Sequence, residues 1–496
     1  MFVINYLKKK NFYDYLLVIF LSFLIFFIAS YSSRDTSWTD FPAWKNDGEN
    51  ILKFFRNINN PEITSSIYFS KHPIGYGIVG YFVKILSFFN FSNGDALRII
   101  NSLFLTIPIF AIISTSLDSH IKKIWILFYG LLMSLSAISL VYIHSGALEV
   151  IQGSLISSYI ISRFFYNKNE EKSKNNLLII RFTTLLSAAL LKDTLIVSIL
   201  LSEGLFIIKS NLVFKNQKLF SNFSKNIHIN NLKSKISLCD FSALTLGISI
   251  SIFWNLIRYK SILPISYLNE SNTIKVTKSD YIQNFLAGIF SPNGGLIFFY
   301  GINIFIVVLV FLKIKELRNT IKKEKLFVFI KFSEISIYST SVIFTALLIN
   351  SKWWAAFGWV SWGNRLIIPW SMSLIISASL GLITFLNIFD SSQELIFLDL
   401  NTNKFKILKN KISFINRKFF ILISRLAIIC GIYYFISSLN MSNYKISSRI
   451  EISGRCQNFY EQIYKNRNQY SPEQEIYNTK EFKLCVRDRF WKLKLP

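Results

Sequence analysis

Long apolar runs separated by bursts of charge constrain the fold of this 496-residue chain more than any other feature. A run of about 17–25 apolar residues can cross the ~30 Å hydrocarbon core of a bilayer as a helix. Only 17% of the residues are charged, whereas a soluble globular protein has about 25%. A soluble enzyme and a disordered chain are therefore excluded. The sequence predicts an all-α polytopic integral membrane protein.

Two stretches decide how many times the chain crosses the bilayer. Residues 177–209 carry Lys192 and Asp193 at their centre, where a charge costs several kcal/mol in a single span. We therefore expect two short helices that meet at this pair. Residues 74–90 contain three glycines and Lys84, and they could cross or lie as a re-entrant or interfacial helix. The other predicted spans are 14–31, 97–117, 124–143, 150–166, 238–258, 296–312, 334–350, 366–388 and 419–439.

The positions of Lys and Arg choose between these possibilities, because basic residues gather in cytoplasmic loops. If 74–90 does not cross, about 11 transmembrane helices and a cytoplasmic N-terminus follow. The inside segments then hold 29 Lys and Arg, and the loops outside hold 11. If 74–90 crosses, most of the basic loops lie outside. We therefore predict the eleven-helix arrangement, in which the net charge of +27 reports topology and requires no nucleic acid.

This topology divides the chain into two domains. Residues 1–440 form the transmembrane domain, with a long first external loop (32–96) that carries surface helices. Residues 441–496 form a basic C-terminal tail that is expected outside, although it holds eleven Lys and Arg. Cys456 and Cys485 lie in this tail, where a disulfide and two free thiols fit equally well.

The external loops gather carboxylates, a few cations and many aromatic side chains. Carboxylates can act as bases or metal ligands, and Lys and Arg can bind phosphate. An interfacial aromatic belt with solvated loop charges would show the same composition. The residues selected as a candidate site are Asp40, Asp47, His72, Glu149, Lys192 and Arg365.

One external segment has the pattern of a surface helix. Residues 47–58 place Ile51, Phe54, Phe55 and other apolar residues on one side at helical spacing. The helix would lie on the membrane and hold Asp47 at its N-terminal end, where the helix dipole favours an acid in any case. Asp40 fits equally well as the N-cap of a helix.

This segment, followed by the sequence KHPIGYG at 71–77, resembles the first external loop of the GT-C glycosyltransferases, in particular of the ArnT/PMT-like members. Three later segments match motifs of that superfamily in the same order. LLKDT at 190–194 resembles VRPT, FSPNGGL at 290–296 resembles FSPxxGL, and GNRLIIP at 363–369 resembles GPRxxxP. The resemblance covers about residues 14–390. It departs from the pattern at Lys192, where Arg is usual, at Asn364, where Pro is usual, and at the acidic doublet around Asp47.

The resemblance implies a membrane enzyme that moves a sugar from a polyprenyl-phosphate (or dolichyl-phosphate) donor to an acceptor hydroxyl, with inversion. It places the reaction on the extracytoplasmic face of a bacterial inner membrane. Asp47 is the expected general base, with Asp40 as the alternative. The expected contacts to substrate or phosphate come from His72, Glu149, Lys192 and Arg365. A divalent cation assists some members and is absent from others, so the cofactor, the sugar and the acceptor stay open.

Two other functions fit the same composition: a transporter or flippase of a lipid-linked or small anionic substrate, and a catalytically inactive membrane partner. Few ionisable residues lie inside the predicted spans, and no paired broken helices occur in two halves. Both observations weigh against a transporter. Convergence of Asp47, Glu149, Lys192 and Arg365 on one external cavity would favour the enzyme.

Overall fold

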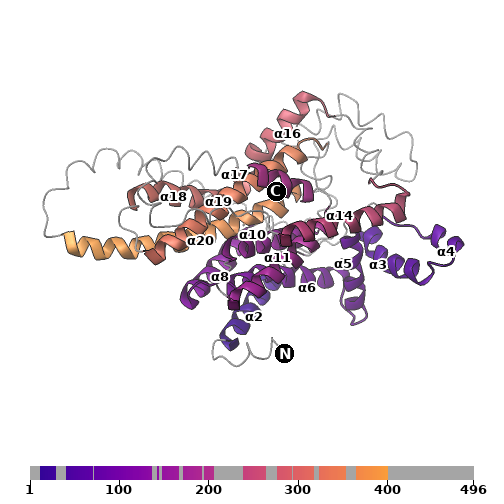
Figure 1. Cartoon of the computed structure of the whole chain (residues 1–496), viewed down its shortest axis with the longest axis horizontal. Coiled ribbons are helices and arrows are strands. Elements are labelled where there is room, and N and C mark those ends of the chain that lie inside the picture. Colours follow the sequence, from indigo (N-terminus) through magenta and orange to yellow (C-terminus); the bar gives the residue numbers. More distant parts are fainter. Residues whose placement is uncertain are drawn as a thin grey trace.

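The computed structural model describes a helical protein (Figure 1). The residues it describes are 12–29, 41–70, 72–136, 142–143, 148–166, 171–192, 195–205, 238–263, 276–292, 294–317, 323–353 and 365–399. Within these ranges no β-strand occurs. Asp40, the predicted span 419–439 and the tail 441–496 with Cys456 and Cys485 lie outside them.

Helix α10 (Glu149–Phe165) forms the centre of the molecule, and all of its residues are buried. Its neighbours are α6 (Asn93–Leu105), α7 (Ile107–Ile113), α11 (Glu171–Leu191), α19 (Lys323–Asn350) and α20 (Ile368–Asp399). Small residues allow this close packing, as is usual between membrane helices. The hydroxyls of Ser154 and Ser158 bond back to carbonyls one turn earlier in α10.

Four stretches of helix are long and apolar enough to cross a membrane. They are Asn93–Ile113, Leu238–Tyr259, Phe327–Asn350 and Arg365–Phe385. Each coincides with a span predicted from the sequence, so the prediction of a membrane protein with apolar helices is confirmed. The count of eleven crossings stays a prediction. The other apolar helical stretches among the described residues have 17 residues or fewer, which is shorter than the four long ones.

The remaining helices connect and flank these four. In chain order they are α2 (Phe12–Ala29), α3 (Phe41–Arg56), α4 (Pro61–Ser66), α5 (Ile74–Ser87), α8 (Ser119–Ser134), α16 (Lys278–Phe290), α17 (Leu296–Phe299) and α18 (Gly301–Leu317). Of the four long stretches, Leu238–Tyr259 is helix α14, and Arg365–Phe385 begins with the 3-10 turn η4 (Arg365–Ile367). Residues 195–205 are also helical.

The predicted break at the Lys192–Asp193 pair is present. Helix α11 ends at Leu191, Lys192 is not helical, and the next helix begins at Leu195. Helix α5, which occupies the ambiguous stretch 74–90, has 14 residues. At a rise of 1.5 Å per residue it is about 21 Å long. It is too short to cross a ~30 Å hydrocarbon layer alone.

The surface helix is present, but its start was predicted wrongly. Helix α3 begins at Phe41, so Asp47 lies in its second turn and not at its N-terminal end. Pro42 explains the early start, because proline fits the first turn of a helix, where its missing N–H has no intrahelical partner. The helix dipole therefore gives no account of Asp47. Leu52, Phe55 and Ile58 are exposed, as expected for a face that lies on a membrane.

Candidate active site

Asp47 is buried and is held on both carboxylate oxygens by one residue, Ser70. The backbone N–H of Ser70 donates to Oδ1 over 2.9 Å, and the Ser70 hydroxyl donates to Oδ2. Asp47 itself is 2% exposed. Because both oxygens are engaged, the carboxylate has a fixed orientation in the structure.

Arg258, at the end of α14, holds the segment that carries Ser70. Its Nη1 donates to the carbonyl oxygens of Ser70 and His72, over 3.0 and 2.5 Å. Its Nη2 donates to Asn255 Oδ1 over 2.7 Å. The indole N–H of Trp254 also points to the His72 carbonyl, at 3.5 Å. Thus α14 fastens Ser70 and His72 to the bundle, although it lies almost 190 positions later in the chain.

Two kinds of effect act on the pKa of Asp47 in opposite directions. Burial raises the pKa of Asp47 above its ordinary value, while the hydrogen bonds from Ser70 and the charge of Arg258 lower it. Burial is the largest of these effects, so the pKa remains raised. A carboxylate with a raised pKa is a stronger base, which suits proton abstraction from a hydroxyl.

His72 lies beside Asp47, but its ring is engaged in packing. The imidazole stacks on Tyr76, with ring centroids 4.8 Å apart, and the side chain is 9% exposed. Tyr76 in turn packs edge-on against Trp44 of α3. The stacking of its ring supports a structural role for His72 in shaping the loop.

A second cluster brings together three of the predicted residues from distant parts of the chain. Glu149 begins α10, Lys192 follows the end of α11, and Arg365 begins η4. Glu149 Oε1 lies 3.6 Å from Arg365 Nε. Lys192 interacts electrostatically with both Glu149 and Arg365. Two cations and one carboxylate therefore meet where these helix ends converge.

The acidic side of this cluster has unused hydrogen-bonding capacity. Gln152, one turn after Glu149, donates from Nε2 to the Leu191 carbonyl over 3.3 Å. Among the described residues, Glu149 Oε2 and Gln152 Oε1 are buried and accept no hydrogen bond. Two buried acceptors next to two cations suit a ligand that has both hydroxyl groups and an anionic group.

Helix α5 lies between the two clusters. A side chain added at Gly75 would lie 2.8 Å from the carbonyl oxygen of Leu190, two positions before Lys192. Half a turn later, a side chain added at Gly77 would lie 3.2 Å from Asp47 Cβ. The glycines of the KHPIGYG segment therefore let α5 approach α11 on one side and α3 on the other.

Other predicted features do not join these clusters among the described residues. Asp40, Asp193 and most of the tryptophan-rich loop (354–364) lie outside the described ranges. In the FSPNGGL segment, the Gly295 N–H donates to the Ser291 carbonyl over 2.6 Å. In the part of the chain that the structure describes, no group of three His, Cys, Asp or Glu residues could hold a metal ion.

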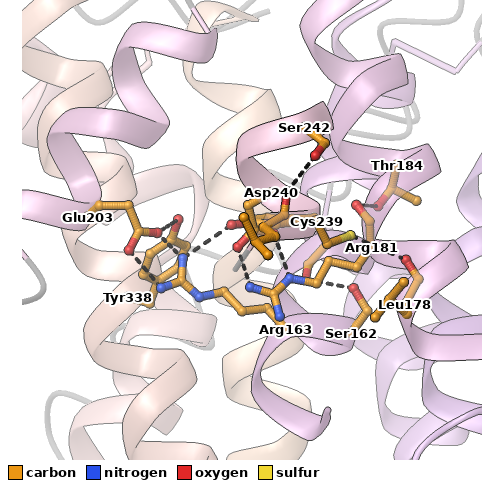
Figure 2. A network of polar contacts seen from close by, with 12 residues as sticks. Ser162, Arg163, Leu178, Arg181, Thr184, Glu203, Cys239, Asp240, Ser242 and Tyr338 are labelled. Carbon is orange, nitrogen blue, oxygen red and sulfur yellow. Dashed lines mark hydrogen bonds and ion pairs between the residues drawn. The ribbon is translucent and has the colours of Figure 1, made fainter. Parts of the chain in front are cut away.

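A third cluster of charges was missed by the sequence analysis (Figure 2). Arg163 pairs with Glu203 through two hydrogen bonds, and the Tyr338 hydroxyl donates to the same carboxylate over 2.8 Å. Arg181 pairs with Asp240 in the same two-pronged way. These four charged side chains are at most 5% exposed. The expectation of few ionisable residues within the helices is therefore wrong.

This charge network lies away from the candidate site. Glu149 begins α10, whereas Arg163 lies near its other end. Asp240 lies near the start of α14, whereas Arg258 lies near its end. The network and the candidate site thus occupy opposite ends of the same helices. Both ion pairs are internally balanced, which indicates a structural role.

Ser70, Arg258 and Gln152 were also missed as members of the site. Nothing in the local sequence distinguishes Ser70 or Gln152 from other polar residues. Arg258 stands at the end of a predicted span, where a cation is ordinary. Only the folded chain shows that Arg258 reaches back to the first loop.

Comparisons with known proteins give little beyond this geometry. No protein-family model and no curated protein matches the chain. Among solved structures it is similar to ArnT from Cupriavidus metallidurans bound to undecaprenyl phosphate, with 10% sequence identity and a TM-score of 0.41. The likeness covers 97% of this chain and 77% of that one. At this distance it assigns no function, which is inferred below from the residues of the chain itself.

Proposed function

We propose that the chain is a membrane glycosyltransferase of the GT-C type. In this proposal it transfers a sugar from a polyprenyl-phosphate donor to an acceptor hydroxyl, on the extracytoplasmic face of the membrane. The observation that carries the proposal is the convergence of Glu149, Arg365 and the end of α11 that precedes Lys192, which Gln152 of α10 contacts at Leu191. Lys192 and Arg365 belong to two motifs that resemble the superfamily, and 173 positions separate them in the sequence.

The two clusters supply complementary chemistry. Lys192 and Arg365 would bind the donor phosphate and stabilise the negative charge that grows on it as it departs. The buried oxygens of Glu149 and Gln152 would accept hydrogen bonds from sugar or acceptor hydroxyls. Asp47 would take the proton of the attacking hydroxyl.

The reaction would be a single displacement at the anomeric carbon. A bond forms between the acceptor oxygen and this carbon, while the bond to the phosphate oxygen breaks on the opposite face. Polyprenyl phosphate leaves as a stable anion, and the hydroxyl proton moves to Asp47. The work of the protein is therefore positioning and charge stabilisation.

The buried ion pairs favour a transporter as the second candidate, because charges within helices often mark a transport path. Transport sites lie near the middle of the bilayer between broken helices. Arg163 and Asp240 instead lie near the ends of their helices, and the central Arg181 of α11 is paired with Asp240, so all four charges have bound partners. This placement supports the glycosyltransferase over the transporter.

A deletion strain complemented with variants tests the proposal. We expect Asp47→Asn to abolish transfer, because an amide cannot accept the proton, while protein level and membrane insertion are unchanged. Mass spectrometry of surface glycans and glycoproteins should show one sugar lost in the deletion strain and in Asp47→Asn. The donor lipid should accumulate in both.

The matched control is Glu62→Gln, which neutralises an exposed acid on the neighbouring helix α4. This variant should restore the sugar fully. Full restoration by Asp47→Asn would move the base to Asp40. Unchanged glycans in the deletion strain, or transbilayer movement of a lipid-linked sugar by purified protein without transfer, would contradict the proposed function.

A further inference from the structure

We propose that Arg258 and Ser70 are positioning residues that hold the Asp47 carboxylate ionised and in one orientation. The inference rests on the proposed function, in which Asp47 is the base. It adds two residues that no motif contains, one from the first external loop and one from the far end of α14.

Ser70 fixes the orientation of the carboxylate. Its N–H and its hydroxyl bond to different oxygens of Asp47, so rotation of the carboxylate would break both bonds. The same hydroxyl accepts the N–H of His72 over 3.2 Å. Ser70 can therefore act only if the backbone at Ser70 and at His72 keeps its conformation.

Arg258 supplies that conformation. Nη1 donates to the carbonyls of Ser70 and His72, while Nη2 donates to Asn255. The planar guanidinium therefore fixes the direction of these bonds, which the ammonium of a lysine would not do as well. The guanidinium is itself fixed by Asn255 and by the rings of Trp254 and Tyr259, which lie 5.2 and 4.7 Å from it. Trp254 also packs against Phe69, with ring centroids 4.8 Å apart. The segment is thus held to α14 on both sides of Ser70.

Arg258 also has an electrostatic effect on Asp47. It is the charged group that lowers the pKa of Asp47, against the raising effect of burial. The other ionisable groups on the elements packed around Asp47 are Lys45, Glu49, Lys53 and Arg56 on α3, Glu62 on α4, Tyr68 and His72 between α4 and α5, Tyr76, Tyr81 and Lys84 on α5, and Tyr259 on α14. Lys84 pairs with Glu49. Arg258 therefore provides the favourable charge for the ionised form.

The two effects can be separated by substitution. Arg258→Gln removes the charge and the fork, whereas Arg258→Lys keeps the charge and loses the fork. Ser70→Ala removes the hydroxyl that bonds to Oδ2, whereas Ser70→Thr keeps a hydroxyl. Lys260→Gln is the matched control, because Lys260 is an exposed cation two positions from Arg258.

Infrared difference titration of the purified chain in lipid nanodiscs measures the protonation of Asp47 without any substrate. The carbonyl band of protonated Asp47 is identified by its loss in Asp47→Asn. We expect its midpoint to move to higher pH in Arg258→Gln and Ser70→Ala. It should stay at the wild-type value in Arg258→Lys, Ser70→Thr and Lys260→Gln.

Glycan mass spectrometry in the complemented deletion strain gives the second readout. Arg258→Lys should lose most of the transfer although its midpoint is unchanged, and Ser70→Thr should restore transfer. Unmoved midpoints in Arg258→Gln and Ser70→Ala, in protein that elutes and melts like the wild type, would overturn the inference. Transfer by Asp47→Asn would instead refute the proposed base, whatever the titration shows.

Discussion

Lys192 follows the end of α11, and both Glu149 and Arg365 influence its charge. Burial lowers the pKa of Lys192, Arg365 lowers it further, and Glu149 raises it. A lysine loses its charge as the pH rises through its pKa. Because the pKa of a free lysine is ~10.4, binding of the donor phosphate should weaken with rising pH already below that value.

This sensitivity gives a prediction about the pH dependence of transfer. Glu149→Gln removes the group that raises the pKa of Lys192, so the alkaline limb should move to lower pH. Lys192→Arg should move it to higher pH, because arginine keeps its charge throughout this range. The measurement is the pH profile of transfer in isolated membranes. An alkaline limb that is identical in Lys192→Arg and wild type would contradict a role for the Lys192 charge.

The candidate residues could be predicted individually, but their partners could not. Lys192 and Arg365 were found because short motifs around them resemble a superfamily. Ser70 and Arg258 have no such motif, and the contact between them joins positions 188 apart. A single sequence does not show which polar residues form a hydrogen bond when they lie so far apart in the chain.

At the scale of elements, the approach of α3 to α5 depends on Gly77. A side chain added there would lie 2.8 Å from Ile51 Cδ1 and 3.2 Å from Asp47 Cβ. We expect Gly77→Ala to displace Asp47, to reduce transfer strongly and to cost about 1–3 kcal/mol of stability. The second substitution Ile51→Val removes Cδ1 and should recover much of both losses. Glycan analysis and thermal unfolding in detergent measure the two effects.

Gly130 of α8 is the control for this prediction. A side chain added there meets nothing within 4 Å, so Gly130→Ala should be neutral or slightly stabilising. Failure of Ile51→Val to rescue Gly77→Ala would show that the close contact with Ile51 does not limit the packing.

Long apolar runs predicted which stretches of the described residues form long helices, because burial in lipid or protein selects the same residues. The break at Lys192 followed from the cost of a central charge, and α11 ends there. The start of α3 was misplaced because residues 41–46 mix Pro, Trp and Lys, which show no helical period alone. Pro42 fits the first turn of α3, and packing of Trp44 and Gly48 against α5 stabilises this early part of the helix.

At the scale of the whole molecule, the charge network of Figure 2 holds five helices together. Its members come from α10, α11, the helix at 195–205, α14 and α19. Such partners are invisible in a single sequence, where each charge stands alone near the end of an apolar run. The paired state explains why these charges are tolerated.

The pair Arg181–Asp240 gives a prediction of stability. Asp240→Asn leaves the Arg181 charge buried without its partner, which should cost about 3–5 kcal/mol. Exchange of the two residues, in Arg181→Asp with Asp240→Arg, should recover part of this loss. Thermal unfolding in detergent measures both. Glu49→Gln, which breaks the more exposed pair with Lys84, should change stability by about 0–1 kcal/mol. An equal loss in Glu49→Gln and Asp240→Asn would contradict the argument.

The pair Arg181–Asp240 also has a consequence for the insertion of the protein into the membrane during synthesis. Arg181 leaves the ribosome 59 residues before Asp240 does. A lone arginine within a helix costs about 2.5–3.5 kcal/mol to insert. We therefore expect α11 to wait at the translocon until α14 emerges, so that the two helices enter the lipid as a unit. On this account, α11 enters the membrane later than its position in the chain alone would suggest.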